Sequence, residues 1–109
     1  MEDFLDIVHN LMQFTDEVLE VKLSSESYEY HAKLLNNLEE ACEKQKWSVM
    51  LDLIKQLDDI CETTIKMLLR EEYDWYGAQV NELYRLLFYI IDREVEEINN
   101  LPWIEIENN

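Results

Sequence analysis

Residues 24–42 read SSESYEYHAKLLNNLEEAC, and the spacing of their apolar residues predicts a helix. The pair Ser24-Ser25 offers a side-chain cap for the first amide groups. Glu26 and Glu29 fall in the expected first turn, where the aligned peptide dipoles favour negative charge. We therefore expect a helix to begin at this serine pair. Its apolar stripe recurs at steps of three and four and consists of Tyr28, His31, Leu34, Leu35, Leu38, Ala41 and Cys42.

The next apolar stripe is out of phase with the first. It consists of Met50, Ile54, Leu57, Cys61, Ile65 and Leu68. Continuing the first stripe in heptad steps would place core positions near Gln45, Val49 and Asp52 instead. A turn near Lys44-Gln45-Lys46 reconciles the two stripes, so we expect a helical hairpin. One long helix over residues 25–69 stays open as the alternative, because no Gly or Pro interrupts this part of the chain.

Amphipathic helices are also predicted on both sides of this pair. The N-terminal stripe consists of Phe4, Ile7, Val8, Leu11, Phe14, Val18 and Val21. The C-terminal stripe consists of Val80, Leu83, Tyr84, Leu87, Phe88, Ile91, Val95 and Ile98, and Pro102 ends it. Asp74 offers a cap for a last helix that begins at Trp75. Gly77 predicts that the chain bends or packs closely around residues 71–77.

One Gly and one Pro among 109 residues are too few to build the turns of a many-stranded β fold. With 48% hydrophobic residues, the chain can still bury a core. We therefore expect an all-α protein, a small antiparallel helical bundle of about four helices. A single domain would cover residues 1–100, and a short C-terminal tail would follow over residues 101–109.

The net charge constrains the partner. Twenty-five Asp and Glu against nine Lys and Arg give a formal charge of −16, which repels nucleic acid and anionic membranes and attracts cationic protein surfaces. Direct nucleic-acid binding is not expected, because Lys and Arg supply most of the affinity for phosphate. No apolar run reaches the roughly 18 residues that cross a bilayer, and the acidic N-terminus is unlike a secretory signal. We expect a cytoplasmic protein with no membrane partner.

The sequence offers little for catalysis. Cys42 and Cys61 fit no common zinc spacing, and we expect both to be buried structural thiols. Metal sites in helical bundles use Glu-x-x-His pairs, to which Asp6-x-x-His9 is the nearest approach. Folding the hairpin about its turn brings His31 opposite Cys61, but an acidic position in mid-helix does not activate a thiol, so we expect a packed pair. No catalytic residue, metal, cofactor or enzymatic activity is predicted.

Aromatic residues mark two candidate binding surfaces. The segment Arg70–Tyr76 gathers aromatic and acidic residues around an expected interhelical turn, which is typical of a binding hot spot. In the alternative, Tyr73 and Tyr76 plug the end of the bundle. The apolar run Leu86–Ile91 belongs either to a central helix or to one whose outer side is a homodimer seam or partner groove.

The tail Leu101–Glu107 alternates Ile with Glu and is expected either to cover the last helix or to add a strand to a partner. The candidate partner-binding residues are Glu71, Glu72, Tyr73, Asp74, Trp75, Tyr76, Tyr89 and Trp103.

We expect a non-enzymatic acidic binding protein that blocks or sequesters a basic protein, as an inhibitor or immunity protein that mimics nucleic acid would. Relief of charge repulsion further predicts that moderate acidity, from pH 7 to 5.5, does not weaken the fold. The alternative is a chaperone or adaptor that shelters an amphipathic segment of its partner. In size and helical-hairpin character, with Lys46-Trp47 followed by Met50-Leu51 and Leu53-Ile54, the chain is similar to flagellar export chaperones. That resemblance implies the secretion-chaperone function.

Overall fold

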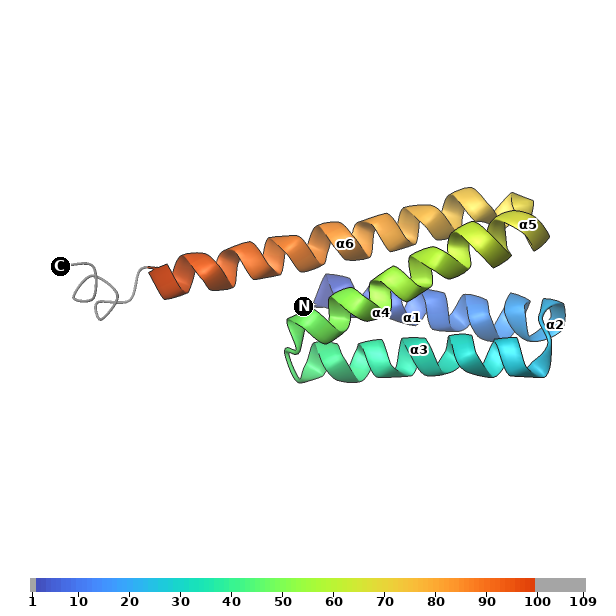
Figure 1. The fold of residues 1–109 in the computed structure, drawn as a ribbon, viewed down its shortest axis with the longest axis horizontal. Coiled ribbons are helices and arrows are strands. Elements are labelled where there is room, and N and C mark those ends of the chain that lie inside the picture. The colour runs from blue at the N-terminus through green and yellow to red at the C-terminus, as the bar shows by residue number, and fades with distance from the viewer. Residues whose placement is uncertain (1, 100–109) are drawn as a thin grey trace.

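Four antiparallel helical rods make up residues 2–99, the part of the chain that the computed structural model describes, with side chains described through Glu94 (Figure 1). The first rod joins α1 (Glu2–Phe14), the π-helical turn η1 (Thr15–Leu19) and α2 (Glu20–Lys22). The second is α3 (Ser25–Glu43). The third joins α4 (Trp47–Ile60), the π-helical turn η2 (Cys61–Ile65) and α5 (Lys66–Leu68), and the fourth is α6 (Arg70–Asn99). No strand occurs within residues 2–99, so the predicted all-α bundle is confirmed.

The predicted hairpin is confirmed and the single long helix is excluded. Ser24 caps α3, since its hydroxyl oxygen accepts a hydrogen bond from the Ser27 amide at 3.2 Å. At the other end Gln45 takes a left-handed conformation with φ 56°. This turns the chain, and the Lys46 amide donates back to the Ala41 carbonyl at 2.9 Å.

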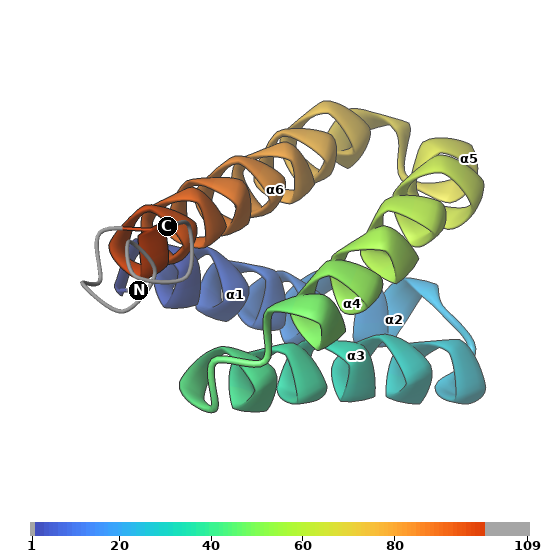
Figure 2. The ribbon, with the colours of Figure 1, turned by 60° about the vertical axis from the view of Figure 1, so that its left-hand side comes forward.

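The four rods pack in a square around one core. Contacts join α1 to α3, α3 to α4, α4 to α6 and α6 to α1, and Figure 2 shows this arrangement from a second side. Each rod contributes one apolar face, as the stripes predict. The fully buried side chains include Phe4, Val8, Leu11, Leu35, Leu38, Met50, Ile54, Leu57, Leu83 and Leu87.

The predicted stripes are wrong at the ends of the first and third rods. Val21 is 79% exposed and Leu68 is 63% exposed, whereas Leu19 and Leu69 are buried. The two π-helical turns explain the change, because a π turn inserts an extra residue and rotates the residues after it about the helix axis. Leu19, the last residue of η1, and Leu69, the residue after α5, therefore fall outside the 3.6-residue patterns of α1 and α4.

Helix α6 begins at Arg70, so the predicted cap at Asp74 and start at Trp75 are wrong. The chain breaks instead at Leu69, whose φ and ψ are −133° and 62°. Helix α6 then runs through residues 71–77 without the predicted bend. Gly77 lies against Cys61, but a Cβ built there would meet the Sγ of Cys61 at an ordinary contact distance of 3.7 Å, so the packing does not require a glycine.

With 30 residues, α6 is longer than its neighbours and projects past the opposite end of the bundle (Figure 1). Within the apolar run, Leu87 is buried but Phe88 and Tyr89 are 49% and 57% exposed. The run is therefore not enclosed by the other rods, and the prediction of a central helix is wrong. Trp103 and the tail Leu101–Glu107 lie outside the described residues.

Candidate functional site

The first turns of α6 present their side chains in three directions. Glu71, Glu72 and Trp75 face a cleft beside α1, and Tyr73 and Asp74 face a second cleft beside α4 and η2. The third direction leads into the core. A single segment thus separates two surface hollows at one end of the bundle.

The cleft between α1, η1 and α6, here called the tryptophan cleft, has a volume of about 420 Å³. Its lining consists of Asn10, Gln13, Phe14, Glu17, Val18, Glu71, Glu72 and Trp75. The Trp75 side chain is 40% exposed. Its ring centroid lies 5.1 Å from that of Phe14, at an interplanar angle of 47°. The cleft thus combines an apolar floor with three carboxylates and no basic side chain.

The cleft between η2, the end of α4 and α6, here called the tyrosine cleft, has a volume of about 280 Å³ and a more polar lining. That lining consists of Asp58, Cys61, Glu62, Tyr73, Asp74, Gly77, Ala78 and Asn81. The Tyr73 hydroxyl donates to Glu62 Oε1 at 2.8 Å, and this hydrogen bond, with burial and nearby acids, raises the pKa of Tyr73 to about 12. Lys66 Nζ lies 5.6 Å from the centroid of the Tyr73 ring. The ring of Tyr73 is therefore already in contact with a cation of the same chain, Lys66.

Tyr76 lies in the core, so its assignment as a partner-binding residue is wrong. Its side chain is fully buried, and its hydroxyl lies 2.7 Å from Nε2 of His31. His31 Nδ1 lies 2.9 Å from the Thr15 hydroxyl, which itself donates to the Leu11 carbonyl at 2.7 Å. Because that donation uses the only Thr15 hydroxyl proton, His31 must donate from Nδ1 and accept from Tyr76 at Nε2.

This hydrogen-bonded chain links three rods of the bundle. It requires a neutral imidazole, and burial lowers the pKa of His31 to about 4. Burial likewise raises the pKa of Tyr76. At neutral pH His31 is therefore uncharged and Tyr76 keeps its proton. Their hydrogen bonds fix the packing of α1, α3 and α6, and neither group is arranged for proton transfer to a surface ligand. The alternative, in which Tyr73 and Tyr76 plug the bundle end, therefore holds for Tyr76, whereas Tyr73 lines the tyrosine cleft.

The cysteines are core residues, as the sequence predicts. Cys42 and Cys61 are both buried. Burial, followed by the charges of Glu62 and Asp58, raises the pKa of Cys61 to about 11, so its thiol stays protonated at neutral pH. Because both ring nitrogens of His31 are engaged elsewhere, no Cys/His dyad forms.

His9 does not pair with Asp6 in a metal-like site. Its Nε2 lies 2.5 Å from a carboxylate oxygen of Glu39, which joins α1 to α3. Within the described residues no group of three or more His, Cys, Asp or Glu side chains is placed to hold a metal ion. None of the helices in residues 2–99 combines the length and hydropathy that a bilayer crossing requires.

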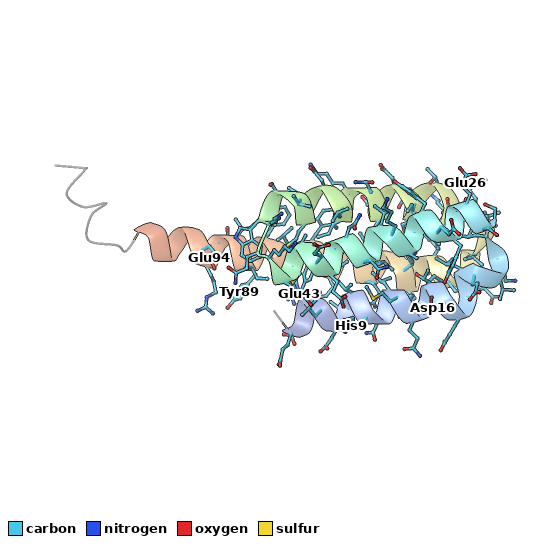
Figure 3. All side chains as sticks on the ribbon, turned by 90° about the horizontal axis from the view of Figure 1, so that it is seen from below. His9, Asp16, Glu26, Glu43, Tyr89 and Glu94 are labelled. Atoms are coloured by element: carbon cyan, nitrogen blue, oxygen red, sulfur yellow. The ribbon has the colours of Figure 1, made fainter. Side chains whose placement is uncertain are left out.

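A separate apolar surface lies where α6 leaves the bundle. Figure 3 shows Tyr89 at this point, with Glu94 farther out on the projecting helix. Phe88 stacks on Tyr84, with ring centroids 6.4 Å apart, and the Tyr89 ring lies 6.0 Å from the Arg93 guanidinium. A hollow of about 300 Å³ beside it reaches the start of α1. Tyr89 is therefore far from the clefts that flank Trp75.

The structure groups five of the predicted binding residues and separates the others. Glu71, Glu72, Tyr73, Asp74 and Trp75 line the two clefts. Tyr76 is in the core, Tyr89 is at the far end, and Trp103 is outside the described residues.

Sequence reasoning missed Phe14 and Glu17, which complete the tryptophan cleft. The signal was available in part, because antiparallel first and last helices would place the end of one beside the start of the other. The chain matches no protein-family model, no curated protein and no solved structure.

Proposed function

We propose that this chain is a non-enzymatic acidic protein that binds a basic protein and blocks or sequesters it. The observation that supports the proposal is the pair of acidic clefts at the start of α6. Glu17, Glu71 and Glu72 line one cleft, and Asp58, Glu62 and Asp74 line the other. The exposed face of Trp75 lies at the same end of the bundle.

The two features contribute differently to binding. Exposed ion pairs contribute only about 0–1 kcal/mol each, so the carboxylates mainly raise the rate of encounter with a cationic surface. A desolvated Trp at the centre of an interface contributes about 2 kcal/mol or more. We therefore assign the speed of association to the net charge of −16 and the lifetime of the complex to the aromatic surface.

The target we propose is a protein with a cationic groove, such as a nucleic-acid enzyme that this chain inhibits. Carboxylates on the rims of the two clefts would occupy positions that phosphates take in the natural substrate. An immunity protein for a toxic nuclease belongs to the same class.

The experiment recovers the partner from the native host by affinity capture and measures its association rate by stopped flow at low and high salt. The triple variant E71Q/E72Q/D74N should associate more slowly than the unaltered chain, and the difference should shrink as salt rises. A matched control is D6N/E43Q/D92N, which removes the same charge from exposed positions toward the other end of the bundle. Equal slowing by both variants, or none, contradicts the proposed site.

A chaperone or adaptor is the second candidate, and the exposed rings of Phe88 and Tyr89 favour it. An amphipathic partner segment would cover this face through apolar contacts. Binding of that kind should change little with salt and should weaken in the variant F88A/Y89A. If binding of the partner weakens in E71Q/E72Q/D74N instead, the acidic clefts are the site.

A further inference from the structure

We infer that the tryptophan cleft binds one arginine side chain of the partner, with its guanidinium stacked on Trp75 and held by the surrounding carboxylates. The inference rests on the proposed function and names the chemical group that the cleft selects. It concerns one cleft, so it can fail while the wider acidic surface still binds a basic protein.

The lining of the cleft suits a long side chain with a charged end. Phe14, Val18 and Trp75 supply apolar surface for a methylene stem. Glu17, Glu71 and Glu72 line the same cleft as the indole and supply hydrogen-bond acceptors. No Lys or Arg lines the cleft, although Arg70 is adjacent in sequence.

The carboxylates are available to a ligand. Within residues 2–94, neither Glu71 nor Glu72 takes part in an ion pair or side-chain hydrogen bond. Glu17 accepts one hydrogen bond, from Gln13 Nε2 at 3.0 Å, which leaves its second oxygen. Three carboxylates without a cation repel one another, and a guanidinium relieves that repulsion.

In the tyrosine cleft, a cation of the chain itself already lies over the aromatic ring and beside a carboxylate. There Lys66 lies over the ring of Tyr73, and its Nζ is 3.7 Å from Glu62, which also accepts from Tyr73. Among the described residues no cation lies over Trp75 in this way. An external cation would complete the tryptophan cleft as Lys66 completes its neighbour.

Arginine fits better than lysine for geometric reasons. A guanidinium is planar, stacks on an indole and donates two parallel hydrogen bonds to a carboxylate. It is also more weakly hydrated than an ammonium group, so less is lost when it enters a partly apolar cleft. A cation over an aromatic ring at an exposed site tightens binding by roughly two- to fivefold, and lysine gains this as well as arginine. The stacking and the paired hydrogen bonds that only a guanidinium makes should favour arginine by at least about twofold beyond that.

The test titrates the full ¹⁵N-labelled chain with two blocked peptides, Gly-Gly-Arg-Gly-Gly and Gly-Gly-Lys-Gly-Gly, and follows the indole N–H signals by NMR. W75F identifies the Trp75 signal among the three Trp residues. The Arg peptide should shift this signal in a saturable way and bind at least twofold more tightly than the Lys peptide. No saturable shift of Trp75, or equal affinity for the two peptides, overturns the inference.

Variants separate a binding site from a general electrostatic effect. E71Q/E72Q should abolish the preference for Arg, and D6N/D92N, which removes the same charge at the far end, should retain it. Equal loss in both variants overturns the inference. Thermal melts followed by circular dichroism confirm that each variant is folded. If the captured partner still depends on Glu71, Glu72 and Asp74 while the Arg preference is absent, the inference fails and the proposed function stands.

Discussion

The buried imidazole of His31 makes the stability of this protein depend on pH in a way that can be calculated. Burial lowers the pKa of His31 from 6.5 to about 4 in the folded protein. Below about pH 6.5, His31 therefore binds a proton in the unfolded chain but stays neutral in the folded chain until the pH nears 4. The stability that neutral His31 contributes is complete above pH 6.5 and is lost as the pH falls from there to about 4.

The size of the effect can be worked out from the pKa shift. One pKa unit corresponds to 1.36 kcal/mol, so the loss is about 1 kcal/mol between pH 7 and 5.5 and about 3 kcal/mol by pH 4. Charge repulsion acts in the opposite direction, because protonation of carboxylates relieves the net charge of −16. Carboxyl groups titrate mainly near pH 4, however, so the His31 contribution should dominate above pH 5.5. The fold should then weaken slightly over this range, against the expectation from net charge alone.

Urea unfolding at pH 7.0, 6.2 and 5.5 measures this dependence. The comparison uses H9Q, which leaves His31 as the only imidazole, and H9Q/H31Q. At pH 7, H31Q should lower the free energy of unfolding by about 1–3 kcal/mol, because it disrupts the bonds to Thr15 and Tyr76. It should also remove the pH dependence above 5.5. The same slope in both proteins, or an imidazole that titrates near 6.5 by NMR, would show that burial of His31 does not cause the pH dependence.

Three further predictions concern packing. G77A should stabilise the fold by about 0.5–1 kcal/mol, since the new Cβ meets Cys61 at an ordinary contact distance of 3.7 Å; a lower melting temperature contradicts this. L69A should cost about 2–5 kcal/mol and L68A less than about 0.5, because only Leu69 is buried; similar urea midpoints would contradict the π-helical register. Cys61, with its pKa raised to about 11 and its side chain buried, should resist iodoacetamide at pH 8 until urea unfolds the chain; rapid native labelling, read by mass spectrometry, opposes this.

The architecture was predictable because it depends on patterns within single helices. The cap at Ser24 and the phase change near residue 45 specify a hairpin without reference to the rest of the chain. The π-helical turns were not predictable, because the extra residue in each turn adjusts how a rod packs against its neighbours and leaves no pattern in the local sequence. The break at Leu69 was missed for a similar reason, since Asp74 looks like a cap in sequence.

The candidate site was predictable in composition but not in shape. Glu71, Glu72 and Trp75 stand out because acids and aromatics gather in one segment. Phe14 and Glu17 lie about 60 positions earlier, and only the packing of α1 against α6 brings them to the same cleft. Tyr76 looks the same as Tyr73 in sequence, yet its helical position turns it into the core toward His31.

Hydrogen–deuterium exchange of the chain, alone and bound to the recovered partner, is the most direct test of where this protein binds. Binding at the acidic clefts should slow exchange in residues 10–18, 58–62 and 71–81, which line them. Slowing confined to residues 84–94, around Phe88 and Tyr89, would contradict the account and favour the chaperone function.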